Sequence, residues 1–234
     1  MFRRLIHRAR TALPGQCAVC RAWPAQPLCE SCVARFAQPQ PRCLTCALPV
    51  PSGVRQCGRC VSAPPPLDAC HAAVSYAYPW SGLLGQYKFN GQAGWARAFA
   101  ILLRSAPWVE PVLEQADLVV PMPLSRERLA ERGFNQSLVL ARRLAPRRVR
   151  HDLLLRVRHT RSQAALDRQA RLANIKGAFA VDPMRVADVR GRRVVIVDDV
   201  MTSGASMYAA AEALRAAQAA GVTGIVLART DEPG

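Results

Sequence analysis

The stretch that decides the fold runs from residue 194 to residue 206: Val194-Val-Ile-Val-Asp198-Asp199-Val-Met-Thr202-Ser203-Gly204-Ala205-Ser206. Four apolar residues predict a buried strand that ends in two adjacent carboxylates. A loop of small and hydroxyl-bearing residues follows, and then a helix begins. In an open α/β sheet, ligands bind beyond the carboxyl ends of the strands. The pattern therefore predicts a binding site at this strand-to-helix turn.

The chemistry of the turn favours a phosphorylated sugar. Backbone N–H groups at a helix N-terminus bind anions, and a glycine lets the backbone approach them closely. The two carboxylates suit vicinal hydroxyls and Mg²⁺. A ligand with a 5′-phosphate and a free ribose diol fits both parts, and an aspartate-capped turn without a ligand is the alternative. The expected binding residues are Asp198, Asp199, Thr202, Ser203, Gly204, Ala205 and Ser206.

The segments around this turn alternate between strand and helix patterns. We predict strands at 73–78, 118–122, 194–197 and 222–228, and helices at 95–104, 134–144 and 207–219, and Gly221 can terminate the last helix. Such alternation predicts an α/β fold with a mostly parallel sheet and helices on both faces. The chain has 234 residues, half of them hydrophobic, which is enough for one sizeable core and a small additional module.

Eight of the nine cysteines form four C-x-x-C pairs near the start of the chain. Two such pairs can complete a tetrahedral Cys₄ zinc site. Sequential pairing of the four is the simplest, and an interleaved pairing stays open. A disulfide framework would need an oxidising compartment, which nothing in the sequence indicates. We therefore expect two structural Zn²⁺ ions, and we interpret Cys70 as a buried core thiol. The expected ligands are Cys17, Cys20, Cys29, Cys32, Cys43, Cys46, Cys57 and Cys60.

Residues 61–67 contain three consecutive prolines and read as a stiff spacer. We therefore divide the chain into an N-terminal double zinc-ribbon module (1–62), a proline-rich linker (63–72) and the sheet domain (73–234).

No apolar run reaches the roughly 18 residues that a membrane span needs. The first fifteen residues lack the apolar core of a signal peptide. We expect a cytoplasmic protein with no transmembrane segment.

The net charge of +16 is concentrated in one quarter of the chain. Between residues 121 and 180, thirteen arginines and Lys176 outnumber four acidic residues, which places +10 of the charge there. Such a field favours nucleic acids or phosphorylated small molecules. A contribution to solubility alone is the other interpretation.

Residues 194–206 resemble the signature of type I phosphoribosyltransferases that binds phosphoribosyl pyrophosphate (PRPP). Nearly the whole chain is similar to one branch, the ComF family of competence-associated proteins. Thr202-Ser203-Gly204 stands where that family usually has Thr-Thr-Gly, and the hydroxyl is kept. The shared features are the cysteine pairs, Tyr87-Lys88-Phe89, Val120-Pro-Met-Pro-Leu124, Arg132-Gly-Phe-Asn-Gln136, Thr160 with Gln163, Arg171 with Asn174, Gly177-Ala-Phe179 and Ala228-Arg229.

The resemblance implies a type I phosphoribosyltransferase-like fold that binds PRPP with Mg²⁺. Asp198 and Asp199 would be its catalytic carboxylates. It also implies a pyrophosphate loop with Arg126, Arg128 and Arg132. A flexible loop that closes over PRPP would include Arg156, Arg158, Thr160 and Gln163, and an exposed amphipathic helix at 163–175 is the alternative there.

The family further implies a role in natural competence, where single-stranded DNA enters the cytoplasm. Its partners would then be PRPP, single-stranded DNA, and a competence helicase or membrane channel protein. The alternative is an active phosphoribosyltransferase in nucleotide or base metabolism with no DNA role. The fold alone does not decide whether catalysis is retained. No residue of the sequence identifies a phosphoribosyl acceptor.

Overall fold

The computed structural model describes residues 15–89, 91–158 and 175–231. They belong to two compact units, Met1–Gln38 and Pro39–Gly234. In the described part of the first unit, the first cysteine pair lies on a turn, and the second lies at the start of α2 (Glu30–Phe36), with Cys29 as its N-cap and Cys32 inside it. Within the described ranges, no helix is long and apolar enough to cross a membrane.

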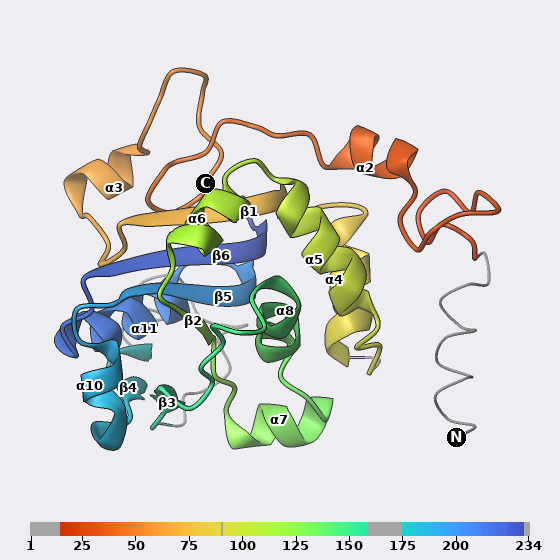
Figure 1. Cartoon of the computed structure of the whole chain (residues 1–234). Coiled ribbons are helices and arrows are strands. Elements are labelled where there is room, and N and C mark those ends of the chain that lie inside the picture. Colours follow the sequence, from red (N-terminus) through yellow and green to blue (C-terminus); the bar gives the residue numbers. More distant parts are fainter. Residues whose placement is uncertain (1–14, 90, 159–174, 232–234) are drawn as a thin grey trace. The chain divides into compact units, whose positions relative to one another are not determined.

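The second unit is built on a four-stranded parallel sheet (Figure 1). The strand order is β1-β6-β5-β2, and each neighbouring pair is parallel. The bounds are β1 (Ala69–Ser75), β2 (Leu118–Pro121), β5 (Arg193–Met201) and β6 (Gly221–Arg229). The apolar run of β5 is buried because the sheet is covered on both sides. The predicted α/β fold class is confirmed.

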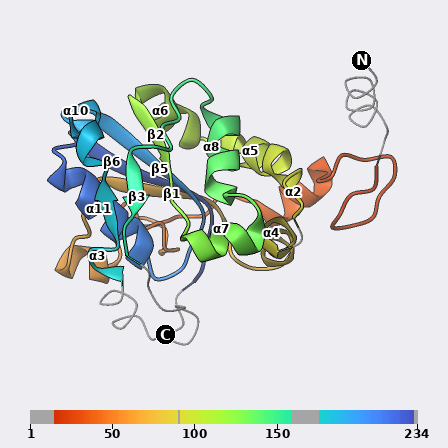
Figure 2. The ribbon, with the colours of Figure 1, turned by 90° about the horizontal axis from the view of Figure 1, so that it is seen from below.

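Helices cover both faces of this sheet (Figures 1 and 2). One face carries α5 and α8, which pack against each other and against the strands. The other face carries α11 and the small antiparallel pair β3–β4. The remaining elements of the unit are α3 (Gly58–Ser62), α4 (Trp80–Phe89), α5 (Trp95–Ser105), α6 (Val109–Gln115), α7 (Arg126–Arg132), α8 (Gln136–Leu144), β3 (Leu154–Arg156), β4 (Phe179–Val181), η2 (Pro183–Arg185), α10 (Val186–Val189) and α11 (Ala205–Ala216).

Several boundaries differ from the sequence expectations. Strand β1 begins at Ala69, inside the expected linker, because it pairs with β6 from Ala69 opposite Thr223 onward. Helix α11 spans Ala205–Ala216 and not the expected 207–219, since Gln218 takes a left-handed backbone conformation (φ 64°) and Gly221 already opens β6. Helices α4, α6 and α7 were not predicted.

The second set of four cysteines lies in the same compact unit as the sheet. Cys43, Cys46 and Cys60 are buried in the hydrophobic core together with residues of β1 and α11. The Cys70 N–H of β1 donates to the Leu44 carbonyl at 2.8 Å. Cys70 itself is 2% exposed, which confirms it as a core thiol. The division of the chain at residue 62 stays a prediction.

Candidate functional site

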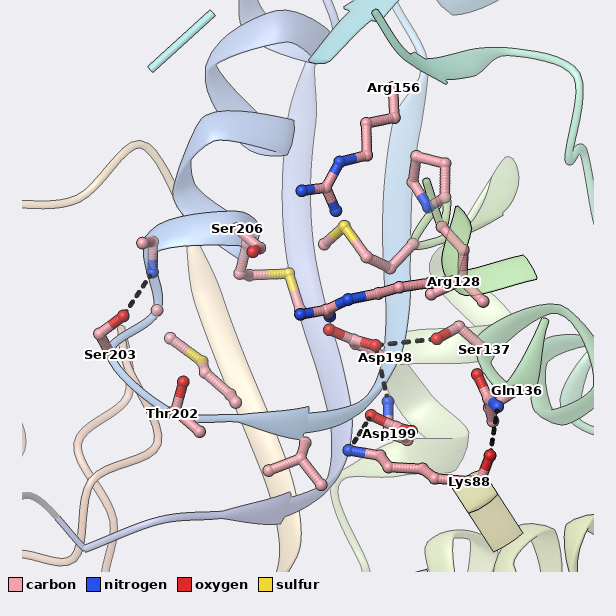
Figure 3. Close-up of a pocket in the computed structure, with 18 of the residues that line it drawn as sticks. Lys88, Arg128, Gln136, Ser137, Arg156, Asp198, Asp199, Thr202, Ser203 and Ser206 are labelled. Atoms are coloured by element: carbon pink, nitrogen blue, oxygen red, sulfur yellow. Dashed lines mark hydrogen bonds and ion pairs between the residues drawn. The ribbon is translucent and has the colours of Figure 1, made fainter. Parts of the chain in front are cut away.

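A cavity of about 300 Å³ opens at the carboxyl ends of β2 and β5 (Figure 3). Every residue from Asp198 to Ser206 lines it, so all seven residues expected at the turn come together here. The opposite wall comes from α7, the start of α8 and the end of α4. The position agrees with the rule that ligands of open α/β sheets bind beyond the strand ends.

The first carboxylate of the pair, Asp198, is held by hydrogen bonds from two directions. Its Oδ1 accepts from the Ser137 hydroxyl at 2.8 Å and from the Asp199 N–H at 2.9 Å. Burial raises the pKa of Asp198 to about 7, the charge of Asp199 adds to the rise, and Ser137 and Lys88 oppose it. Asp198 can therefore gain or lose a proton near neutral pH.

The second carboxylate, Asp199, is almost fully buried at 5% exposure. Its Oδ1 lies 3.1 Å from the Lys88 ammonium, which reaches in from the end of α4. Its Oδ2 is buried and has no hydrogen-bond partner among the described residues. An unsatisfied buried oxygen of this kind costs about 1–3 kcal/mol, or more when it is charged. A hydroxyl donor or a cation in the cavity would remove that cost.

The loop after β5 turns into the N-terminus of α11 at Gly204. This residue has φ +84°, and a Cβ there would lie 2.6 Å from the Tyr208 ring and 2.7 Å from the Met201 methyl group. Only glycine fits both the conformation and the space. The twelve-residue α11 then begins at Ala205, with its first N–H groups at the cavity. This arrangement can bind a phosphate.

Three arginines line the wall across from the loop. Arg128 and Arg132 come from α7, Arg156 comes from β3, and Figure 3 shows Arg128 and Arg156 reaching into the pocket. The Arg132 guanidinium lies 5.2 Å from the centre of the Phe89 ring, and Nη1 donates to Gln136 Oε1 at 3.1 Å. Its buried Nε has no hydrogen-bond partner in the described part of the chain. An anion in the cavity could accept from it.

The expected pyrophosphate loop is largely the helix α7. Ser125 caps it by accepting from the Arg128 N–H at 3.3 Å, and Gly133 ends it in a left-handed conformation. Two of its three arginines line the cavity, whereas Arg126 is exposed and is not among the lining residues.

The expected flexible loop is only partly described. Arg156 lines the cavity. Arg158 donates to the Lys176 carbonyl at 2.6 Å and is not among the lining residues. Thr160 and Gln163 lie outside the described residues, as do Arg171 and Asn174.

The sequence did not identify Lys88 and Ser137 as parts of the site. Lys88 lies in the Tyr87-Lys88-Phe89 segment that carried part of the resemblance, but nothing in its spacing places it beside Asp199. Ser137 follows Gln136 at the start of α8, and both residues are buried. Two buried polar residues at the start of a helix can indicate a binding site. The sequence does not show that Gln136 and Ser137 are buried, so this signal appears only in the structure.

The eight paired cysteines form two groups, first pair with second and third pair with fourth. In each group the four sulfur atoms lie within 4.8 Å of one another. Cys20 and Cys29 Sγ are 3.6 Å apart, as are Cys46 and Cys57 Sγ. Tetrahedral zinc with bonds of about 2.3 Å requires a separation of about 3.8 Å, and a disulfide about 2.05 Å. All nine thiols are free, so each group could hold a zinc ion.

One thiol in each group is already acidified. Burial opposes ionisation of Cys17, but backbone N–H groups of Cys20, Cys29 and Val19 outweigh it and lower the pKa to about 6. The same balance lowers the pKa of Cys43 to about 7. Metals bind the thiolate and not the thiol. Burial and neighbouring cysteines raise the pKa of the Cys32 and Cys46 thiols to about 12, so without a metal only part of each group is ionised at neutral pH.

Comparisons with known proteins find a family and several relatives that this chain resembles. The phosphoribosyl transferase domain family matches residues 129–233. The DNA utilization protein YhgH of Escherichia coli (strain K12) is 33% identical over 229 residues, covering 93% of this chain and 98% of the relative. Competence protein F of Haemophilus influenzae is 29% identical over 197 residues, which is 80% of this chain and 84% of the relative. Competence protein ComFC of Bacillus subtilis is 29% identical over 148 residues, which is 63% of this chain and 58% of the relative.

Proposed function

The chain belongs to the ComF family of competence and DNA utilization proteins with a phosphoribosyl transferase domain, and on that premise we propose that its cavity binds PRPP with Mg²⁺. We further propose that it acts in natural competence, in handling incoming single-stranded DNA in the cytoplasm. The observation that carries the ligand assignment is the buried Asp199 Oδ2, which lacks a donor in the described structure.

The two ends of PRPP fit the two sides of the cavity. A ribose diol can donate to Asp199 Oδ2, which lacks a donor in the described structure, and to the neighbouring carboxylate of Asp198. The backbone from Thr202 to Ser206, at the start of α11, can bind the 5′-phosphate. Arg128, Arg132 and Arg156 can then hold the pyrophosphate, because guanidinium groups bind phosphate oxygens bidentately.

Asp198 and Asp199 are also the residues that would hold Mg²⁺. Hard carboxylate oxygens suit this ion, and a buried oxygen without a partner is satisfied by a cation as well as by a hydroxyl. When bound, Mg²⁺ would neutralise charge on a departing pyrophosphate. The two carboxylates would orient the ribose beside it.

The alternative function is an active phosphoribosyltransferase in nucleotide or base metabolism. The observation in its favour is the pKa of Asp198 near 7, because a general acid or base works best near the ambient pH. Release of pyrophosphate from PRPP in the presence of a panel of bases would support this alternative.

Titration calorimetry with PRPP–Mg²⁺ tests the ligand assignment. Asp199→Asn should weaken binding by about 1–3 kcal/mol, the range for a hydrogen bond to a charged group. Glu212→Gln is the matched control, because Glu212 is exposed on α11 and does not line the cavity. Equal affinity of the wild type and Asp199→Asn would refute the assignment.

The proposal for DNA rests on exposed charge and exposed aromatics. Arg142, Arg143, Arg147 and Arg148 are exposed in the basic stretch. Tyr78 and Phe89, 71% and 64% exposed, could stack on bases, as in sequence-tolerant single-strand binders. A competence helicase or membrane channel protein would be the further partner.

Fluorescence anisotropy with a short single strand tests this part. A plot of the logarithm of the binding constant against the logarithm of the salt concentration should be linear. Its slope should be about −0.7 for each phosphate contacted. Reversing the charge of Arg142 and Arg143 should weaken binding, whereas Arg55→Glu, an exposed change outside the basic stretch, serves as the control. Absence of binding at strand concentrations on the order of 10 μM would contradict the DNA role.

A further inference from the structure

A buried guanidinium lies at the carboxyl end of β6. Arg229 is 1% exposed, and a buried charge is tolerated only when it is paired or hydrogen-bonded. Its Nε donates to the Cys46 carbonyl at 2.9 Å. Its Nη1 donates to the carbonyls of Met201 at 3.1 Å and Thr230 at 2.7 Å, and also to the carbonyl of Thr202.

These carbonyls belong to two different sites. Cys46 is one of the four thiols of the second cysteine group, whereas Met201 and Thr202 begin the loop that lines the cavity. One planar, rigid group therefore connects the backbone of a metal-ligand residue to the backbone of the proposed phosphate loop. A guanidinium can do this because it donates from several edges in a fixed geometry, which a lysine ammonium cannot reproduce.

A second contact runs beside the first. The Tyr208 ring packs against Gly204 so closely that a Cβ on that glycine would overlap it. The same ring lines a cavity of about 20 Å³ together with Cys46, Cys60 and Arg229. Tyr208 therefore connects the loop at Gly204 to the surroundings of the second cysteine group.

We propose that Arg229 is a positioning residue that couples metal binding at the second cysteine group to ligand binding by the Thr202–Ser206 loop. A metal at Cys43, Cys46, Cys57 and Cys60 fixes the Cys46 carbonyl, which fixes the guanidinium and in turn the carbonyls of Met201 and Thr202. The loop is then ordered before the ligand arrives, and preorganisation raises affinity. Because coupling is reciprocal, the ligand also tightens metal binding. The inference rests on the proposed function of the cavity.

The effect should lie in the usual range for coupled sites, about 5- to 150-fold in affinity. Cys57→Ser should lower the zinc content of the full chain from two ions to one and weaken PRPP–Mg²⁺ binding at least about fivefold. Arg229→Lys should keep both zinc ions and weaken binding to a similar extent. The double variant should lose little more than either single variant, because the two changes break the same connection. Arg215→Lys, on the same domain in a solvent-accessible ion pair with Asp68, is the matched control.

Cys29→Ser is a second control, which should remove a metal from the first group. It measures how far the loss of any metal from the chain lowers the affinity for PRPP–Mg²⁺. An equal loss of affinity in Cys29→Ser and Cys57→Ser would overturn the proposal. Fully additive losses in the Arg229→Lys/Cys57→Ser double variant would overturn it as well. Circular dichroism and thermal unfolding identify any variant that has lost its fold.

A readout without ligand separates this proposal from that of PRPP binding. Hydrogen exchange of the amides from Thr202 to Ser206 should speed up in both Cys57→Ser and Arg229→Lys. If PRPP does not bind the zinc-loaded wild type, the proposed function fails, yet faster loop exchange would still demonstrate the coupling. Unchanged exchange in both variants would refute the coupling even if PRPP binds.

Discussion

Lys88 and Asp199 form an ion pair inside the cavity, with Nζ 3.1 Å from Oδ1 and side chains only 16% and 8% exposed. The lysine comes from α4 and the aspartate from β5, so the pair connects this helix to the central sheet. The lysine neutralises one carboxylate oxygen and leaves the other for a ligand. The pair thus serves stability and proposed binding together.

Removing the lysine should destabilise the protein. Lys88→Met leaves the buried Asp199 charge uncompensated, a change that costs about 3–5 kcal/mol in buried pairs. Urea denaturation measures the loss. Lys88→Met/Asp199→Asn should recover part of it, because no unpaired buried charge then remains. Glu110→Gln, which breaks an exposed pair with Arg104, should cost at most about 1 kcal/mol. A loss for Lys88→Met no larger than for Glu110→Gln would show that the pair contributes nothing.

The raised pKa of Asp198 predicts a pH dependence of stability. In the folded protein this carboxyl holds its proton up to about pH 7. Its unfolded pKa is about 3.9, so the folded state binds more protons between these values. This contribution to the free energy of unfolding is fully present below about pH 4 and is lost as the pH rises to about 7.

Unfolding measured from pH 5 to 8 without added Mg²⁺ checks this dependence. Asp198→Asn cannot titrate at this position. The free energy of unfolding of the wild type should therefore fall relative to that of the variant as the pH rises toward about 7. Other groups, including the cysteine thiols, contribute equally to both proteins and cancel in the difference. A pH-independent difference would mean that Asp198 is already ionised in the folded protein.

Gly204→Ala should disrupt the loop. The new Cβ would meet the Tyr208 ring and the Met201 methyl group at a positive φ, which is expected to cost about 1–3 kcal/mol in stability. Affinity for PRPP–Mg²⁺ should fall with it. Gly82→Ala is the control, since a Cβ there meets nothing within 4 Å inside helix α4 and should stabilise by about 0.5–1 kcal/mol. Wild-type affinity and stability in Gly204→Ala would contradict the described loop.

Metal analysis of the reduced protein should find two zinc ions per chain. The two groups of four thiols, each within 4.8 Å, provide the sites. Mass spectrometry under native conditions would show the mass of both ions, and a chelator should remove them with loss of structure around residues 15–60. One ion or none in a folded, reduced sample would refute the two-site prediction.

The turn after β5 could be predicted because its signals are local. An apolar run, two acids, a glycine and small residues are adjacent in the chain, and they report strand, strand end and loop directly. Gly204 takes the positive φ that a glycine in a tight loop suggests. The same holds for the cysteine pairs, whose spacing reports a turn that aims two thiols at one point.

Lys88 and Ser137 could not be predicted as site residues because their positions depend on tertiary packing. Lys88 is 111 positions from Asp199 in the sequence, and the packing of α4 against α5, and of α5 and α8 against the sheet, brings these parts of the chain together. Helix α4 was missed because Gly82 and Gly85 weaken the helical pattern. Helix α7 was missed because its seven residues bury none of their side chains and show no apolar period.

The second cysteine group has a practical consequence for dissecting the protein. A fragment that begins after the prolines would lose Leu44 and Cys46, which supply backbone partners to Cys70 and Arg229. It would also expose core surface that Cys43, Ala47 and Cys60 cover. Such a fragment would be prone to aggregation even though it contains every strand of the main sheet. The shortest piece suited to expression and crystallisation therefore starts near Pro39, with the second cysteine group included.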